Sequence, residues 1–120
     1  MNKTTLVLGA STNSDRYSNI AVRHLRKNGH TVVAIGNKSG LIGDVSIMTD
    51  TPLIENVHTV TLYLNPNNQI NYYQYILSLK PKRIIFNPGT ENDEFFNMAS
   101  DNGIDVIEAC TLVLLSTGQY

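Results

Sequence analysis

The sequence of 120 residues contains no tryptophan and a single cysteine, and only 16% of its residues are charged. Because Cys110 has no second cysteine to pair with, an internal disulfide is excluded, which is typical of a reducing compartment. The net charge of −1 gives no basic surface for a nucleic-acid partner. No apolar run approaches the roughly 20 residues that span a bilayer, and the amino-terminal run is too short for a signal peptide. We therefore expect a cytoplasmic protein without a membrane or nucleic-acid partner.

Segments with the pattern of buried strands alternate with segments of helical periodicity along the chain. Such alternation is typical of parallel strands joined by right-handed crossovers, with helices on both faces of the sheet. We predict one three-layer, Rossmann-like α/β domain over residues 1–120, with a five-stranded parallel sheet in the order 3-2-1-4-5. Its topological switch point would lie between the first and fourth strands. The predicted strands are residues 4–8, 31–35, 57–64, 83–86 and 104–107, and the predicted helices are residues 18–27, 66–79 and 91–101.

Two segments fall outside this pattern. Residues 36–56 lack a firm periodicity and include three glycines, and Pro52 is expected to open one turn of helix near their end. A loop this long in a small domain is often functional, so we predict that residues 40–43 close over a ligand. The tail from residue 108 carries a second apolar run, residues 112–115, which we expect to pack back on the domain.

The stretch LVLGASTNSDRYSN, residues 6–19, reads as a strand, a polar loop and the start of a helix. We predict Ser18 as the helix N-cap. The first amides of a helix lack partners within the helix and carry partial positive charge, so an anion binds there without a basic side chain. Arg16 adds a side chain that can pair bidentately with a phosphate. This crossing is therefore the predicted phosphate site.

The glycine pattern of this loop does not match a dinucleotide site. The G-x-G-x-x-G pattern begins at Gly9, but Ser11 and Ser14 stand at the later positions. The acid that bonds the ribose of NAD at the end of the second strand is replaced by Asn37-Lys38. A lysine at this corner suits a ribose that carries its own phosphate, as in NADP and coenzyme A.

Several motifs together resemble a known family. They are VLGASTNSDRYSN, the helix end KNGHTVVAIGNK, the Ile42-Gly43 pair, LYLNP, NPGTEN and Cys110. On these residues the chain is similar to the small stand-alone CoA-binding domain proteins, which are Rossmann-like and related to the CoA-binding domain of the succinyl-CoA synthetase alpha subunit. The sequence departs from the family where Lys38 replaces a proline and where Phe86-Asn87 replaces a tryptophan-glutamine pair.

The resemblance implies a set of ligand contacts. The diphosphate would lie against Gly9, Ala10, Ser11 and Asn13, with Arg16 beside it. From the loop itself, we add the helix start at Ser18 to this phosphate site. Asn37 and Lys38 would lie by the adenosine and its ribose phosphate. Asn65 and Pro66 would line the pantetheine path, and Asn87, Pro88 and Gly89 would lie at its far end. The implied cofactor is coenzyme A or an acyl-CoA.

No residues with a catalytic pattern converge in the strand-end loops. His24, His30 and His58 lie elsewhere, Cys110 has no histidine near it in sequence, and metal-ligand spacing is absent. We therefore expect a protein that binds coenzyme A without catalysis and without a metal. One alternative is an NAD(P)-binding or acyl-CoA-processing enzyme subunit that needs a partner chain. Another is a regulatory protein that has lost the ligand. Exposed tyrosines and the apolar tail are compatible with a homodimer.

Overall fold

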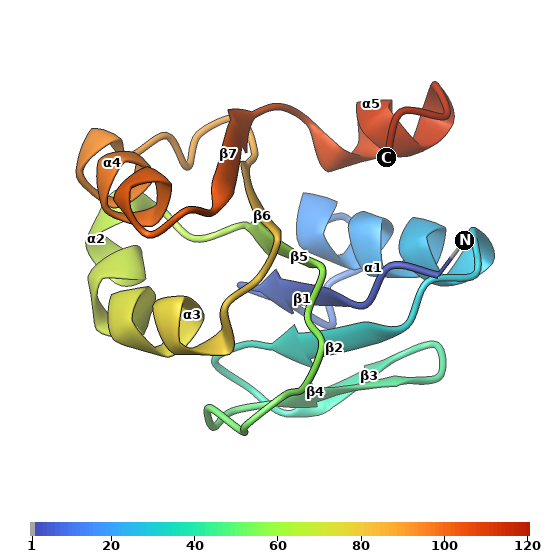
Figure 1. Cartoon of the computed structure of the whole chain (residues 1–120). Coiled ribbons are helices and arrows are strands. Elements are labelled where there is room, and N and C mark those ends of the chain that lie inside the picture. The colour runs from blue at the N-terminus through green and yellow to red at the C-terminus, as the bar shows by residue number, and fades with distance from the viewer. Residues whose placement is uncertain (1) are drawn as a thin grey trace.

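The sheet of this α/β protein is built around β1 (Thr5–Leu8), whose four residues are all buried. The computed structural model, which describes residues 2–120, shows seven strands in the order β3-β4-β2-β1-β5-β6-β7 (Figure 1). All neighbouring strands are parallel except the β3–β4 pair, which is antiparallel. The remaining strands are β2 (Val32–Ile35), β3 (Gly40–Ile42), β4 (Val45–Met48), β5 (Thr59–Leu62), β6 (Arg83–Phe86) and β7 (Asp105–Glu108).

The predicted Rossmann-like class is confirmed, but the predicted strand order is wrong. The third predicted strand is β5, and it pairs with β1 on the side away from β2, with Leu6 opposite Val60. The switch point therefore lies between β1 and β5. The order could not be read locally, because β1 and β5 are both buried at all four positions and both suit the centre of a sheet.

The strand count is wrong because residues 36–56 contain a β-hairpin. β3 and β4 are joined by the two-residue turn Gly43-Asp44, and Gly43 has a φ of +59°. Ile42, Val45 and Ile47 are buried, so the hairpin belongs to the core. The predicted cover over a ligand is thus part of the sheet, and the predicted helical turn after Pro52 does not form. The alternation of inward and outward residues was not apparent in the sequence, because β3 and β4 are short and the segment contains three glycines.

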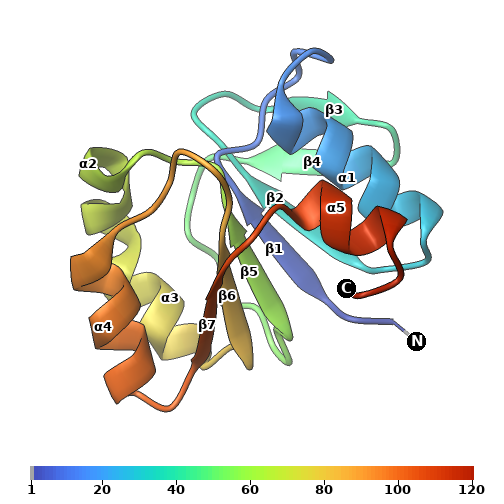
Figure 2. The same cartoon turned by 90° about the horizontal axis from the view of Figure 1, so that it is seen from above.

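Helices cover both faces of the sheet, as predicted. α1 (Tyr17–Lys27) and α5 (Thr111–Ser116) lie together on one face (Figure 2). The other face carries α2 (Pro66–Gln69), the 3-10 turn η1 (Ile70–Tyr72), α3 (Tyr73–Leu79) and α4 (Asp93–Asp101). The tail packs back through Leu114 and Leu115, which contact the core of the α1 face. Within residues 2–120, no helix is long and apolar enough to cross a bilayer.

Two helix starts differ from the predicted ones. α1 begins at Tyr17 with Arg16 as N-cap, and no side chain caps it. Ser18 is therefore not the cap, and it is buried in the first turn. α4 begins after Asn92, whose Oδ1 accepts the Phe95 amide, so the helix starts two residues after the predicted start at residue 91. By contrast, α2 starts as predicted, because Asn65 accepts the Asn68 amide and Pro66 occupies the first position.

Candidate functional site

A pocket of about 660 Å³ opens at the carboxyl ends of β1, β2, β5 and β6. In a parallel sheet, this edge is where loops from neighbouring strands converge on a ligand. Its walls come from the four loop regions that the sequence indicated. The lining residues are Gly9, Ala10, Ser11, Thr12, Arg16, Tyr17, Ser18, Ile35, Gly36, Asn37, Lys38, Tyr63, Leu64, Asn65, Asn68, Tyr72, Pro88, Gly89 and Thr90.

The loop after β1 is pressed closely against its neighbours. Gly9 has a φ of +97°, and a Cβ there would lie 2.9 Å from the carbonyl of Tyr63. The position therefore requires glycine for its backbone conformation and for its packing. The amides of Gly9 and Ala10 both donate to the carbonyl of Ile35, which ties the loop to the end of β2. The start of the loop is thus fixed before any ligand binds.

Two predicted ligand contacts in this loop also shape its backbone. Ser11 Oγ accepts the Asn13 amide at 3.1 Å, and Asn13 Oδ1 accepts the Asp15 amide at 3.0 Å. Such local turns satisfy amides that would otherwise face solvent. The amides of Thr12, Tyr17 and Ser18, in contrast, have no acceptor anywhere in the described chain, residues 2–120. These three N–H groups, and that of Ser11, which also lacks an acceptor within residues 2–120, are available to an anion.

The charge of the pocket favours an anion. Arg16 and Lys38 both line it, and its described lining contains no carboxylate. Neither cation forms an ion pair within residues 2–120, where the Arg26–Asp44 pair is the salt bridge found. Two unpaired cations beside free amides in a concave site attract a phosphorylated ligand.

Most of the predicted site residues line the pocket. They are Gly9, Ala10, Ser11, Arg16, Ser18, Asn37, Lys38, Asn65, Pro88 and Gly89. Asn13, Pro66 and Asn87 do not line it.

Asn87 has a different place from the one that the resemblance implied. Its side chain is 2% exposed. Asn87 Nδ2 donates to Thr61 Oγ1 at 2.7 Å and to the Leu62 carbonyl at 2.9 Å, and its Oδ1 accepts the Thr111 amide at 2.9 Å. These three hydrogen bonds join β5 to the start of α5. Asn87 therefore supports the pocket from behind instead of facing a ligand.

Sequence reasoning missed some lining residues. Thr12 and Tyr17 lie in the predicted loop but were not singled out, and Asn68 follows one turn after Asn65. Of three neighbouring tyrosines, Tyr72 lines the pocket, Tyr73 is buried and Tyr75 donates to the Pro52 carbonyl. Local sequence does not separate the three, because a helix boundary falls between Tyr72 and Tyr73.

A buried amide holds two of the pocket loops together. Gln69 is fully buried, and its Nε2 donates to the carbonyls of Leu64 and Thr90, each at 2.8 Å. Its Oε1 accepts from Asn92 Nδ2 at 2.9 Å, and Asn92 also donates to the Tyr73 hydroxyl. The loops after β5 and β6 are therefore joined by one satisfied polar network, which fixes the width of the pocket at that end.

We searched the pocket lining for groups that could act as a nucleophile, an acid or a base. Its described lining residues include no histidine, no cysteine and no carboxylate. Tyr63 does line it, but burial raises the pKa of its hydroxyl to about 12, so it stays protonated at neutral pH. No group of three or more residues suited to a metal occurs within residues 2–120.

A family model described as a CoA binding domain matches residues 3–116. The chain belongs to the CoA binding domain family. The crystal structure of an uncharacterized protein is similar to this CoA binding domain, with 49% identity and a TM-score of 0.97, over 100% of this chain and 99% of the other. A search of curated proteins finds no relative.

More distant structures show the fold alone. A protein from Thermus thermophilus has 21% identity and a TM-score of 0.87, over 98% of this chain and 90% of its own. An NADPH-dependent glyoxylate/hydroxypyruvate reductase from Sinorhizobium meliloti has 13% identity and a TM-score of 0.64, over 90% of this chain and 47% of its own. The same fold therefore occurs as part of this larger reductase.

Proposed function

We propose that this CoA binding domain binds coenzyme A or an acyl-CoA in the pocket, with the diphosphate on the loop after β1, and catalyses no reaction by itself. The observation that carries the proposal is the set of unpaired amides at Thr12, Tyr17 and Ser18, beside Arg16, in a pocket whose described lining holds no carboxylate. A diphosphate supplies the acceptors that these donors lack.

Each of the two pocket cations suits a different phosphate group of coenzyme A. Arg16 stands at the start of α1, next to the free amides, and its guanidinium suits the diphosphate. Lys38 follows β2, where a dinucleotide fold places the ribose of the adenosine half, so its ammonium suits the ribose phosphate of coenzyme A. Asn65 and Gly89 line the opposite end of the pocket and would contact the pantetheine arm.

Binding without chemistry is supported by the character of the pocket. A reaction on an acyl-CoA needs a nucleophile or an acid and a base within reach of the thioester. The polar neutral side chains near that end are amides and hydroxyls, including Asn65, Asn68 and Thr90. An enzyme subunit completed by a partner chain is the alternative, and it requires that the partner bring the missing groups.

NADP is an alternative ligand for this pocket, because Lys38 suits the phosphorylated ribose of NADP as well as that of coenzyme A. The loop after β1 nevertheless lacks the G-x-G-x-x-G glycines that bring backbone close to a dinucleotide. We therefore expect coenzyme A to bind more tightly than NADP, and NADP more tightly than NAD.

Calorimetric titration with coenzyme A, NADP and NAD at matched ionic strength tests the proposal. We expect saturable binding of coenzyme A and a rise in melting temperature that follows its concentration. The absence of any response to millimolar coenzyme A, together with a clear response to NADP, would overturn it in favour of a dinucleotide protein. No response to any of the three would favour a regulatory protein that has lost its ligand.

A further inference from the structure

Asn19 and Arg23, two residues of α1, form a clip on the back of the loop that follows β1. Asn19 is 4% exposed, and its Nδ2 donates to the Ser11 carbonyl at 2.9 Å. Arg23 lies one turn further along the helix, and its terminal nitrogen donates to the Ser14 carbonyl at 3.1 Å. Neither residue lines the pocket. We propose that this clip is the positioning device that aims the Thr12 amide at the phosphate of the ligand.

The argument rests on the geometry of one peptide unit. The Ser11–Thr12 peptide is trans, so its carbonyl and its N–H point in opposite directions. Because Asn19 holds the Ser11 carbonyl toward α1, the Thr12 N–H points away from that helix. Thr12 lines the pocket, and its amide has no acceptor within residues 2–120. If this peptide rotated, a carbonyl oxygen would replace the donor and repel a phosphate.

Arg23 fixes the orientation of the side-chain amide of Asn19. Arg23 Nε donates to Asn19 Oδ1 at 2.8 Å, so the oxygen of that side chain is committed to the guanidinium. The amide nitrogen then necessarily faces the Ser11 carbonyl, since an asparagine has one acceptor end and one donor end. Holding a donor in place before binding removes part of the ordering cost of the complex. The clip therefore contributes to affinity without touching the ligand.

This inference rests on the proposed function, since it assigns a donor to the phosphate of a bound nucleotide. Two variants remove the clip in different ways. Arg23→Ala removes its exposed half, which leaves the core intact. Asn19→Leu keeps a buried side chain of similar size but has no donor for the Ser11 carbonyl. Lys27→Ala is the matched control, because Lys27 is an exposed cation of the same helix with no bond to the loop.

Titration with ADP and with adenosine, which lacks phosphate, distinguishes a positioning role from general loosening of the fold. We expect both clip variants to raise the Kd of ADP and of coenzyme A about tenfold, the effect of one lost charge-assisted hydrogen bond. The Kd of adenosine should stay the same, and Lys27→Ala should leave all three values unchanged. In ¹⁵N NMR spectra, saturating ADP should shift the Thr12 amide strongly in the wild type and weakly in the variants.

The outcomes separate the two proposals. If the wild type binds coenzyme A and ADP but the clip variants bind them equally well, the positioning role is wrong and the proposed function stands. Equal losses for ADP and adenosine would also overturn the positioning role, because they indicate a general loss of structure. If the wild type binds neither coenzyme A nor ADP, the proposed function fails and the positioning role fails with it.

Discussion

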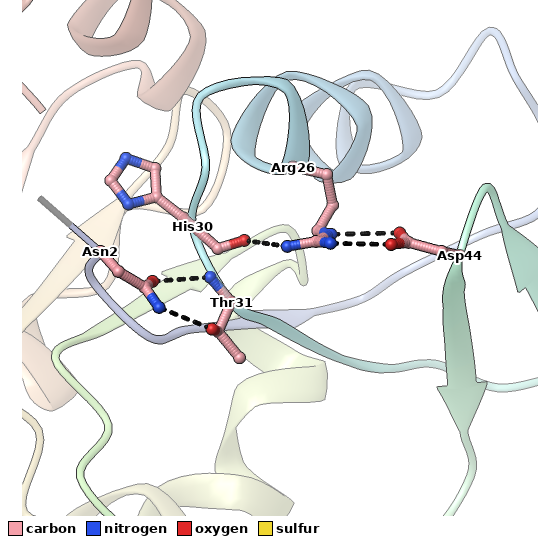
Figure 3. Close-up of polar contacts among 5 residues, drawn as sticks. All are labelled: Asn2, Arg26, His30, Thr31 and Asp44. Carbon is pink, nitrogen blue, oxygen red and sulfur yellow. Dashed lines mark hydrogen bonds and ion pairs between the residues drawn. The ribbon is translucent and has the colours of Figure 1, made fainter.

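Arg26 and Asp44 form a bidentate ion pair that joins the end of α1 to the turn of the β3–β4 hairpin (Figure 3). Arg26 Nε donates to Asp44 Oδ1 at 3.1 Å, and a terminal nitrogen donates to Oδ2 at 2.7 Å. The other terminal nitrogen donates to the His30 carbonyl at 2.9 Å, so the same guanidinium also holds the turn before β2. Close to this turn, the Asn2 side chain forms two hydrogen bonds with Thr31, each 2.8 Å long.

The first prediction concerns this pair. Arg26→Ala and Asp44→Ala should each lower the melting temperature slightly, because both side chains are exposed and solvent screens the pair. The double variant should be no less stable than Arg26→Ala alone, since the partner is already missing. Arg26→Lys should recover little, because an ammonium cannot make three bonds in the planar fork geometry. Thermal unfolding at low and high salt is the measurement, and equal effects at both salt concentrations would contradict an electrostatic origin.

The second prediction concerns the buried amide behind the pocket. Gln69→Leu should destabilise the fold by about 3 kcal/mol, because it leaves the buried carbonyl of Thr90 and the partly buried carbonyl of Leu64 without donors. The loops after β5 and β6 should then separate, so affinity for coenzyme A should fall as well. Asn67→Ala, an exposed change in the same short helix, is the control. Urea unfolding measures the free energy, and a loss no larger than that of the control would show that the network is dispensable.

Features encoded in a few neighbouring residues could be predicted from the sequence. The strand before Gly9 and the Asn65-Pro66 helix start are of this kind, because glycine conformation and capping are local properties. The loops that carry the predicted ligand contacts also lie at one edge of the sheet despite the wrong strand order. Every parallel strand ends at the same edge of the sheet, so these loops converge wherever β5 is inserted.

Features that depend on distant contacts could not be predicted. β5 pairs with β1 on the side away from β2, a contact between segments far apart in the sequence, and the residue pattern of 57–64 does not indicate that side. Asn87 shows the same limit within the site. It follows a strand at the right edge, but the Thr61 hydroxyl and the Thr111 amide, both far away in sequence, turn its side chain inward. Sequence position placed Asn87 at the edge and gave no information about that orientation.

The third prediction compares two glycines that face the loop after β1. A Cβ on Gly36 would lie 2.2 Å from the Ala10 carbonyl oxygen, whereas one on Gly40 would lie 2.4 Å from a methyl group of Thr12. A side-chain methyl can rotate away, but a backbone carbonyl moves only with the whole loop. Gly36→Ala should therefore cost about 2 kcal/mol of stability and more than Gly40→Ala.

A second change checks that comparison. Thr12→Ser removes the methyl group, so it should restore the stability of Gly40→Ala and leave Gly36→Ala unimproved. Chemical denaturation of the four variants gives the ranking. Equal costs at Gly36 and Gly40 would contradict the close backbone contact with Ala10.

The fourth prediction separates the roles of the two pocket cations. Arg16→Ala should weaken coenzyme A and dephospho-coenzyme A alike, by about tenfold, because both ligands carry the diphosphate. Lys38→Ala should weaken only coenzyme A, since dephospho-coenzyme A lacks the ribose phosphate that Lys38 is proposed to meet. Calorimetry on both ligands is the measurement. An unchanged affinity in Arg16→Ala would indicate that this arginine is simply a solvated loop residue.

The last prediction concerns acid stability at the opposite edge of the sheet. Burial lowers the pKa of His30, and the nearby cations Lys3 and Arg83 lower it further. His30 Nδ1 also accepts the Lys3 amide at 3.0 Å, so protonation of that nitrogen breaks a hydrogen bond. Burial likewise lowers the pKa of His58, which faces Arg83, Lys3, Lys82 and His30.

Because the folded-state pKa values lie below the ordinary value of 6.5, the unfolded chain takes up protons first as the pH falls. The free energy of unfolding should therefore be constant above about pH 7 and decrease from about pH 6.5 downward, through the lowered folded values. His30→Gln should flatten this decrease, while the exposed control His24→Gln should leave it as in the wild type. Urea unfolding between pH 5 and pH 8 provides the measurement. An identical pH dependence for His30→Gln and the wild type would show that His30 does not couple protonation to unfolding.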